Sequence, residues 1–332
     1  MRALHVPAAG RQPVLAELPT PAVPDGHVLI KVVAAGLNAV DNTIAAGMMA
    51  EMAPHEYPLV LGRDAAGIVQ QVGTGVDHVA PGDAVFGHVL FTPPVQAGTL
   101  AEYAVLPAAS VCARPANLDF VTAAAIPLAG AAAVAAVDAV APRPGQAALV
   151  NGATGGVGSY AIQLLAARGA TVVATGTPAD TDRLTKLGAT TVVDFTTGSV
   201  TEQVRAAHPH GVDALVNLAG NTTDDVPLAA VRKDGKVATT TTAPDADALA
   251  AAPASPALVS SPSLSPRPSR RSPSRRLPAL CPSRSPPSCR STRQPTDSPP
   301  SPPERRTARS SSRSTISTAV ADRCSCRPKD SF

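Results

Sequence analysis

The chain has 332 residues, which is enough for two domains of ordinary size. Its net charge of +3 conceals an uneven distribution, because residues 1–252 carry a net charge of −8 and residues 253–332 one of +11. The first part holds a single cysteine, Cys112, which excludes an internal disulfide there and favours a reducing, cytoplasmic location. No signal peptide or membrane-spanning run is visible, so we expect no membrane contact.

Residues 1 to about 117 alternate short β-like runs with turn residues. We expect strands at 28–33, 66–72, 84–87 and 100–106. Turn sequences such as Pro24-Asp25-Gly26 and Pro81-Gly82-Asp83 separate them. Several short strands with regular turns predict a small β-barrel.

From about Phe120 the pattern changes to alternating helix and strand. An Ala-rich helix is expected from Thr122 to Val140, where Pro142 and Pro144 stop it. Strands are expected at 147–152, 171–176, 191–195, 213–218 and 236–241, and helices between them include 159–168 and 182–187. This alternation predicts an α/β fold with a parallel sheet.

The glycine-rich stretch at 147–158 organises this second part. It is predicted to be a buried strand, a turn and the start of a helix, with Ala153, Gly155 and Gly158 at the three small-residue positions of a dinucleotide fold. These residues would make the tight turn, let the backbone approach a pyrophosphate, and let the helix pack on the strand. The helix N-terminus would offer N–H groups to the phosphates. The predicted cofactor-binding turn is Ala153, Thr154, Gly155, Gly156, Val157 and Gly158.

Several motifs occur in the order found in one enzyme superfamily. They are Ala35-Gly36-Leu37-Asn38-Ala39-Val40-Asp41, Pro58-Leu59-Val60-Leu61-Gly62-Arg63-Asp64-Ala65-Ala66-Gly67, 79–83, 85–87, 101–103, 126–130, the glycine turn, 187–189 and 211–213. Residues 1 to about 245 thus resemble the medium-chain dehydrogenase/reductase superfamily, in its zinc-independent quinone oxidoreductase branch. The resemblance implies a GroES-like barrel at 1–117, which is the catalytic domain, and a doubly wound Rossmann NADPH-binding domain at 118–250, truncated at its C-terminal end. It also implies an active site in the cleft between the domains and a homodimer in relatives.

The resemblance predicts that this chain binds no zinc. Relatives with a catalytic zinc place Cys, His and Glu ligands in the first two motifs, and these places hold Asn38, Arg63 and Asp64 here. A four-cysteine lobe for a structural zinc is missing between Asp83 and Leu106. The nearby histidines are scattered and are expected at the surface: His55, His78 and His88.

The end of the second nucleotide-domain strand predicts NADPH as the cofactor. The acid that usually contacts the ribose 2′-hydroxyl is replaced by Thr175, Gly176 and Thr177, which leave room for a 2′-phosphate. Arg183 or Lys186 can pair with that phosphate; alternatively both are solvated residues of a surface helix. Asp180 and Asp182 are expected to cap that helix.

Hydride transfer without a metal needs groups that stabilise the negative charge developing on the substrate oxygen. By resemblance, Asn38 would contact the nicotinamide side of the cofactor, although it can also be a simple turn residue. Tyr103 is a candidate proton donor, or else a packing residue of the barrel. A threonine common in relatives is Ala132 here, so we expect one cofactor hydrogen bond to be missing. These features predict an NADPH-dependent reductase of quinones or α,β-unsaturated carbonyls.

The tail from about Ala251 departs from this pattern. Residues 253–332 contain 21 Ser, 16 Pro and 14 Arg and no Gly, a composition that predicts disorder. One alternative function is therefore a nucleotide-sensing or nucleic-acid-binding protein with a basic arm, although the arm has few aromatic residues for stacking on bases. The other interpretation is a frameshift near Ala251, which would truncate the sheet and leave the chain as written weak or inactive.

Overall fold

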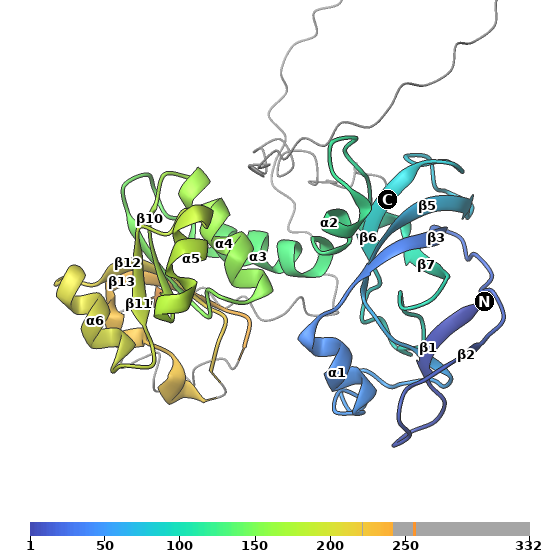
Figure 1. Cartoon of the computed structure of the whole chain (residues 1–332), viewed down its shortest axis with the longest axis horizontal. Coiled ribbons are helices and arrows are strands. Elements are labelled where there is room, and N and C mark those ends of the chain that lie inside the picture. The colour runs from blue at the N-terminus through green and yellow to red at the C-terminus, as the bar shows by residue number, and fades with distance from the viewer. Residues whose placement is uncertain (221, 242–254, 257–332) are drawn as a thin grey trace, which may run out of the picture. The chain divides into compact units, whose positions relative to one another are not determined.

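The structure is a computed structural model that describes residues 1–220, 222–241 and 255–256 (Figure 1). The hypotheses of a disordered tail, a frameshift and a basic arm fall almost wholly outside these residues. The fold that positions the candidate site is formed by residues 1–220 and 222–241.

The N-terminal part is built from antiparallel strands, as predicted for a barrel. One sheet has the order β2-β1-β4 and the other the order β7-β3-β5-β6-β8. Their bounds are β1 Arg2–Val6, β2 Val14–Glu17, β3 His27–Gly36, β4 Leu59–Val60, β5 Asp64–Val72, β6 Ala84–His88, β7 Tyr103–Pro107 and β8 Val111–Ala113. A core of mostly aliphatic side chains, including Ile30, Val69 and Leu106, fills the larger sheet's interior because strand residues alternate between faces.

Three helices lie before the nucleotide-type sheet: α1 (Ala39–Ala45), α2 (Phe120–Ala124) and α3 (Pro127–Val140). The prediction of one helix from Thr122 to Val140 is wrong, because the chain forms two helices separated at Ala125 and Ile126. Pro127 explains the break, since proline has no N–H to donate to a carbonyl oxygen in the preceding helical turn. It instead occupies the first turn of α3, a position that proline tolerates well.

The second part is a parallel sheet with the strand order β11-β10-β9-β12-β13-β14, the order of a doubly wound dinucleotide fold. Its strands are β9 Ala147–Asn151, β10 Thr171–Gly176, β11 Thr191–Asp194, β12 Val212–Asn217, β13 Val231–Thr239 and β14 Ser255–Pro256. Its helices are α4 Gly156–Ala167, α5 Thr181–Leu187 and α6 Val200–Ala207. Short 3₁₀ turns are η1 Ala108–Ser110, η2 Pro178–Asp180, η3 Thr223–Asp225 and η4 Leu228–Ala230.

Apolar side chains cover both faces of this sheet. On one face, residues of α3, α4 and α5 pack on strand residues such as Val150 and Val172. On the other, Val204 of α6 packs with Leu149 and Leu215. β9 is buried along its whole length, and its residues 147–150 form a continuous apolar run, as expected for a central parallel strand.

The last strand extends the sheet beyond the five strands predicted. Ser255 and Pro256 pair in parallel with Lys236 and Val237 of β13. These two residues belong to the range predicted to be disordered, so that prediction does not hold for them.

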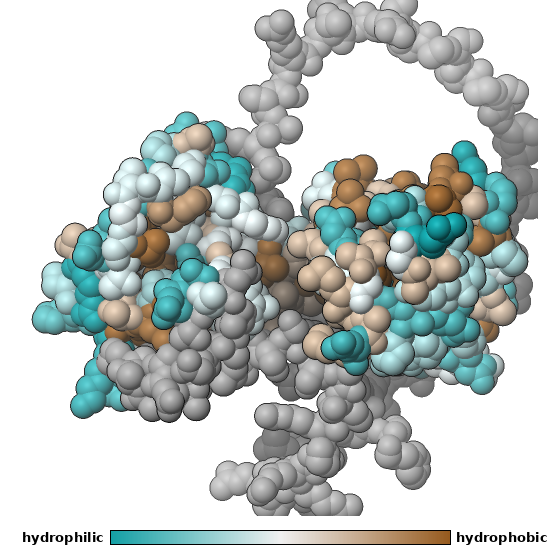
Figure 2. Space-filling view, turned by 90° about the horizontal axis from the view of Figure 1, so that it is seen from below, coloured by the Kyte–Doolittle hydropathy of each residue, from teal (hydrophilic) through white to brown (hydrophobic). Residues whose placement is uncertain are grey.

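Large apolar side chains are also exposed on the described residues. They include Leu15, Leu37, Met48 and Met52, and Figure 2 shows apolar residues among polar ones on the face that it draws. Among the helices described, none has the length and apolar character needed to cross a membrane.

Candidate active site

The glycine turn joins β9 to α4 at the carboxyl end of the central strand. Gly152, at φ 80°, makes the left-handed turn, whereas the sequence assigned the tight turn to Ala153. Ala153 is instead fully buried. Gly155 is the N-cap of α4, which begins at Gly156 and not at the predicted Ser159. Glycine at 152 is needed because a side chain is strained in this conformation.

Gly158 allows α4 to pack closely on the turn, as predicted. A Cβ atom there would lie 2.4 Å from the Gly152 carbonyl oxygen and 2.7 Å from the Ala153 Cα atom. At Gly155 and Gly156, the nearest atoms would be 3.5 Å and 3.6 Å away. Packing therefore requires glycine at position 158, whereas at positions 155 and 156 it leaves room for a Cβ atom.

This turn fits a dinucleotide. Thr154, Gly155 and Gly156 are exposed, and the first turn of α4 presents N–H groups that have no partner within the helix. β9 lies between β10 and β12, where the strand order reverses, and such a switch point is where α/β sheets bind ligands. The residues that would hold the pyrophosphate are thus 154–158.

The second strand contributes less to this surface than predicted. Thr175, predicted to contact the cofactor, is buried, and its Oγ1 atom accepts the Gly152 N–H at 2.9 Å. It therefore supports the turn from inside the sheet. Gly176 lies under α5, where a Cβ atom would be 2.7 Å from Leu184 Cδ1.

Asp180 was predicted to cap the helix at 182–187, but its side chain caps the preceding turn η2 and makes no cap hydrogen bond to α5. Its Oδ2 atom accepts the backbone N–H of Thr177 at 3.0 Å and the Thr177 hydroxyl at 2.8 Å. These bonds cap η2, with Thr177 as the N-cap, and they hold the pKa of Asp180 below its usual range. Asp182, also predicted to cap, lies in the first turn of α5.

Arg183 extends from α5 to the glycine turn. Its guanidinium donates to the Thr154 carbonyl oxygen at 3.1 Å and to Ser159 Oγ at 3.2 Å. It also forms an ion pair with Asp180 at 3.5 Å. Lys186, the other candidate, lies exposed in the last turn of the same helix. Arg183 is thus the candidate that the structure brings to the glycine turn.

A ladder of buried amides and hydroxyls joins the carboxyl ends of β9, β12 and β13. Asn151 Nδ2 donates to Asn217 Oδ1 at 2.8 Å, and Asn217 Nδ2 donates to Thr239 Oγ1 at 3.3 Å. The sequence pattern did not single out these residues, although asparagines at the ends of two buried strands are an available signal.

The barrel side of the site centres on Asp64, which sequence reasoning treated only as a replaced metal ligand. Asp64 Oδ2 accepts the Asn38 side-chain amide at 2.9 Å, and Asp64 Oδ1 accepts the Leu128 backbone N–H at 3.0 Å. Asn38 is also the N-cap of α1, where its N–H donates to Asp41 Oδ2 at 2.8 Å. One carboxylate therefore connects the loop before α1 with the first turn of α3.

Burial shifts the titration of this cluster. It raises the pKa of Asp64 to about 6, although the hydrogen bonds from Asn38 and Leu128 oppose the shift. Burial also raises the pKa of Asp41 and lowers that of Arg63 to about 10. The acids and the guanidinium stabilise each other's charges, but desolvation is the larger effect for each group.

The residues at the places where zinc-dependent relatives have metal ligands do not fit zinc. Arg63 is fully buried, and its guanidinium donates to the carbonyl oxygens of Ala97 at 2.6 Å and Val60 at 3.4 Å. A guanidinium has no lone pair for a metal. Across the described ranges, no group of three His, Cys, Asp or Glu side chains lies within reach of one ion.

The histidines of this region lie in different surroundings. His78 is exposed, as expected, whereas His55 and His88 are partly buried. Burial lowers the pKa of both His55 and His88, and the charge of Arg63 lowers it further.

Two tyrosines are relevant to the search for a proton donor. Tyr103, the predicted proton-donor candidate, is half-buried at the start of β7, opposite Lys31 of β3. Tyr160 of α4 was not predicted; its hydroxyl donates to the Ala125 carbonyl oxygen at 3.1 Å. Burial raises the pKa of the Tyr160 hydroxyl, and the charge of Asp64 raises it further. Ala132 lies in α3, and the missing cofactor hydrogen bond expected there stays a prediction.

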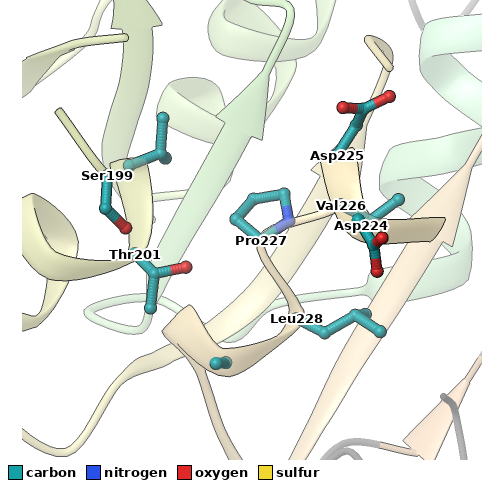
Figure 3. A pocket seen from close by; sticks show the side chains of 9 residues that line it. Ser199, Thr201, Asp224, Asp225, Val226, Pro227 and Leu228 are labelled. Carbon is teal, nitrogen blue, oxygen red and sulfur yellow. The ribbon is translucent and has the colours of Figure 1, made fainter. Parts of the chain in front are cut away.

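A separate cavity of about 510 Å³ lies between the start of α6 and residues 224–229. Ser199 and Thr201 lie on one side, and Asp224, Val226 and Leu228 on the other (Figure 3). None of the predicted site residues lines this cavity.

Comparisons with known proteins agree with this geometry. A model described as "Alcohol dehydrogenase GroES-like domain" matches residues 24–116, and one described as "Zinc-binding dehydrogenase" matches residues 156–265. The second match extends past Ala251, the expected end of the family pattern.

Relatives and solved structures were also found. The mitochondrial NAD(P)H oxidoreductase RTN4IP1 of Mus musculus is 34% identical over 224 residues, which are 62% of this chain and 55% of that protein. An alcohol dehydrogenase superfamily protein from Novosphingobium aromaticivorans is 32% identical, with a TM-score of 0.70 and 78% of each chain covered. The quinone oxidoreductase from Coxiella burnetii is 28% identical, with a TM-score of 0.66, and the match covers 75% of this chain and 78% of that one.

An antiparallel barrel followed by a parallel dinucleotide-type sheet defines a dehydrogenase-type fold. The chain belongs to the medium-chain dehydrogenase/reductase superfamily. It spans about half the length of the curated relatives that it matches.

Proposed function

We propose that this chain is an NAD(P)H-dependent oxidoreductase that prefers NADPH and reduces quinones or other conjugated carbonyl compounds. The observation that carries the proposal is the exposed glycine turn with the Arg183 guanidinium 3.1 Å from the Thr154 carbonyl oxygen. A cation in this place, next to the dinucleotide cradle, favours a cofactor with an additional phosphate.

The proposed preference for NADPH also depends on the lack of a carboxylate at the end of β10. The strand ends in Thr175 and Gly176, so no carboxylate is available there for a ribose 2′-hydroxyl. The following acid, Asp180, is bound to Thr177 and paired with Arg183. A 2′-phosphate would displace Asp180 as the partner of the guanidinium, because phosphate accepts bidentate bonds from arginine.

A reduced nicotinamide, when bound, supplies the hydride. Residues 154–158 would present backbone N–H groups to the pyrophosphate. Asn38 is oriented by the hydrogen bond that its amide nitrogen donates to Asp64. Since the donor set does not fit zinc, the substrate must tolerate reduction without a Lewis acid. A conjugated carbonyl does so, because its π-system spreads the developing negative charge onto oxygen.

The substrate class has support from the comparisons, since a similar structure is titled a quinone oxidoreductase and a relative is named an NAD(P)H oxidoreductase. The proton that follows the hydride has no assigned donor among the described residues. We assign it to solvent water, with Tyr103 as the side chain to test against it.

The cofactor preference is tested by titrating the protein with NADPH and NADH while nicotinamide fluorescence is followed. We expect NADPH to bind about tenfold more tightly, which corresponds to about 1.4 kcal/mol from one phosphate contact. Arg183→Ala should bring the two affinities within about twofold, because it removes the guanidinium that would bind the additional phosphate. Lys186→Ala, on the same helix, is the matched control and should leave the preference unchanged.

Equal binding of the two cofactors by the unchanged protein would overturn the NADPH assignment. Absence of binding to a folded sample would overturn the oxidoreductase assignment as a whole. NADPH oxidation with a naphthoquinone as acceptor then tests the substrate class, and no turnover by a protein that binds NADPH would refute it.

A further inference from the structure

We propose that Asp64 is a positioning residue that fixes Asn38 relative to the dinucleotide-binding part of the chain. The inference rests on the proposed function, because it assigns Asn38 to the side of the site where hydride transfer would take place. It gives a role to Asp64, which the sequence indicated only as a replaced metal ligand.

The two oxygens of the Asp64 carboxylate have separate partners. Oδ2 accepts the Asn38 amide at 2.9 Å, and Oδ1 accepts the Leu128 N–H at 3.0 Å. Leu128 is the second residue of α3, and the residue before it, Pro127, has no N–H. A side chain from β5 thus caps a helix whose first-turn donors have no intrahelical partner.

The contact continues from α3 to the glycine turn. Ala129, the residue after Leu128, faces α4, and its Cβ atom lies 3.6 Å from the position that a Cβ atom on Gly156 would occupy. α3 and α4 pack in the same core cluster on one face of the sheet. Asn38, Asp64, the first turn of α3 and the start of α4 therefore form one continuous series of contacts.

Capping α3 with the Asp64 carboxylate costs free energy, because the charged group is buried away from water. The residue is 1% exposed, and burial raises its pKa to about 6 despite two hydrogen bonds. The charged and titratable groups that act on it are Asp41 of α1, its neighbour Arg63 and Tyr160 of α4. A buried carboxylate is poorly suited to stability alone, which agrees with a positioning role.

The test exchanges the donor and the acceptor between positions 38 and 64. Asn38→Asp alone places two carboxylates against each other, and Asp64→Ala removes the bridge. In the double variant Asn38→Asp/Asp64→Asn, the amide at position 64 can donate to the carboxylate at position 38 while its oxygen still accepts the Leu128 N–H. Aspartate is also a good N-cap, so α1 keeps its cap. Asp83→Asn is the matched control, since Asp83 is an exposed barrel aspartate that accepts one backbone N–H, from Ala80 at 2.8 Å.

Two measurements distinguish a positioning role of Asp64 from an effect on NADPH binding or on overall stability. In the protein without cofactor, amide hydrogen exchange of the peptide that contains Leu128 should rise in Asn38→Asp and Asp64→Ala and stay unchanged in Asp83→Asn. With NADPH and a naphthoquinone, kcat should fall about tenfold or more in the two single variants, because a displacement on the order of 1 Å misaligns reacting groups. The dissociation constant of NADPH should stay within about threefold, because the glycine turn keeps its contacts.

The double variant Asn38→Asp/Asp64→Asn tests whether the hydrogen bond between positions 38 and 64 is what matters. Recovery of exchange protection and kcat to within about threefold of the unchanged protein is expected, since interacting residues show such non-additivity. If the double variant is no better than the single ones, or if folded Asp64→Ala shows unchanged exchange and kcat, the proposal is overturned. If the single variants fail to fold, the double variant supports or overturns the proposal by the same comparison with the unchanged protein. Should the unchanged protein bind no NADPH, the proposed function fails separately, while the exchange measurement still tests the link between Asp64 and Leu128.

Discussion

Gly158→Ala is the substitution for which the structure gives the most definite expectation. The added methyl group would lie 2.4 Å from the Gly152 carbonyl oxygen, 2.7 Å from the Ala153 Cα atom and 2.8 Å from the Ala153 carbonyl carbon. All three atoms belong to the backbone, so no side-chain rotation relieves the overlap. The start of α4 must move away from the turn by about 1 Å to restore ordinary contact distances.

The magnitude follows from two opposing effects. Overpacking of this kind costs about 1–3 kcal/mol, whereas replacing glycine by alanine inside a helix returns about 1 kcal/mol. We therefore expect a net loss of up to about 2 kcal/mol and a melting temperature lower by up to about 8 °C. Moving the helix N-terminus also weakens one charge-assisted hydrogen bond to the pyrophosphate, for a loss of NADPH affinity of about tenfold or more.

Gly156→Ala provides the control in the same turn of helix. Its methyl group would meet only the Ala129 Cβ atom, at an ordinary 3.6 Å, so stability should not fall. Circular dichroism melting and NADPH fluorescence titration measure both variants. The packing argument is refuted if Gly158→Ala melts and binds like the unchanged protein, or if Gly156→Ala lowers the melting temperature by the same amount.

Three further predictions concern stability. The pKa of Asp64 is raised from 3.8 to about 6 in the folded protein, so the folded state binds the proton more tightly than the unfolded state does. The free energy of unfolding should therefore fall by about 3 kcal/mol as pH rises from about 4 to about 6. Urea melts at a series of pH values measure this slope, and Asp64→Asn should remove it. Ala141 ends α3 at φ 38°, so Ala141→Gly should raise the free energy of unfolding by about 1 kcal/mol, and an unchanged or lower urea midpoint would contradict this. Asn217→Ala should cost about 1–3 kcal/mol because it leaves the buried Asn151 amide without its acceptor, and a loss equal to that of an exposed control such as Asn42→Ala would argue against the ladder.

The sequence by itself determined most of the elements and their order. Five strands of the second part were located to within a few residues, apart from the earlier start of β13, because buried parallel strands are apolar runs bounded by glycine and proline. The sixth strand, β14, was not predicted. The glycine turn could also be predicted from local sequence, because a dinucleotide-binding turn needs particular residue types at fixed spacing. The errors at this level were also local: Pro127 divides a predicted helix, and Gly152 takes the turn assigned to Ala153.

Only the tertiary structure decided how the site is held together. Asp64 meets Leu128 across 64 positions of the chain, and Asn151 meets Asn217 across 66, so no local pattern connects either pair. Thr175 was predicted at the surface of the cofactor site, but strand pairing and the turn above it bury its hydroxyl against the Gly152 N–H. Local sequence determines conformation and which faces are apolar, whereas the partner of a buried polar group is selected by the packing of distant segments, because such a group must find its hydrogen bond wherever the fold places a donor or an acceptor.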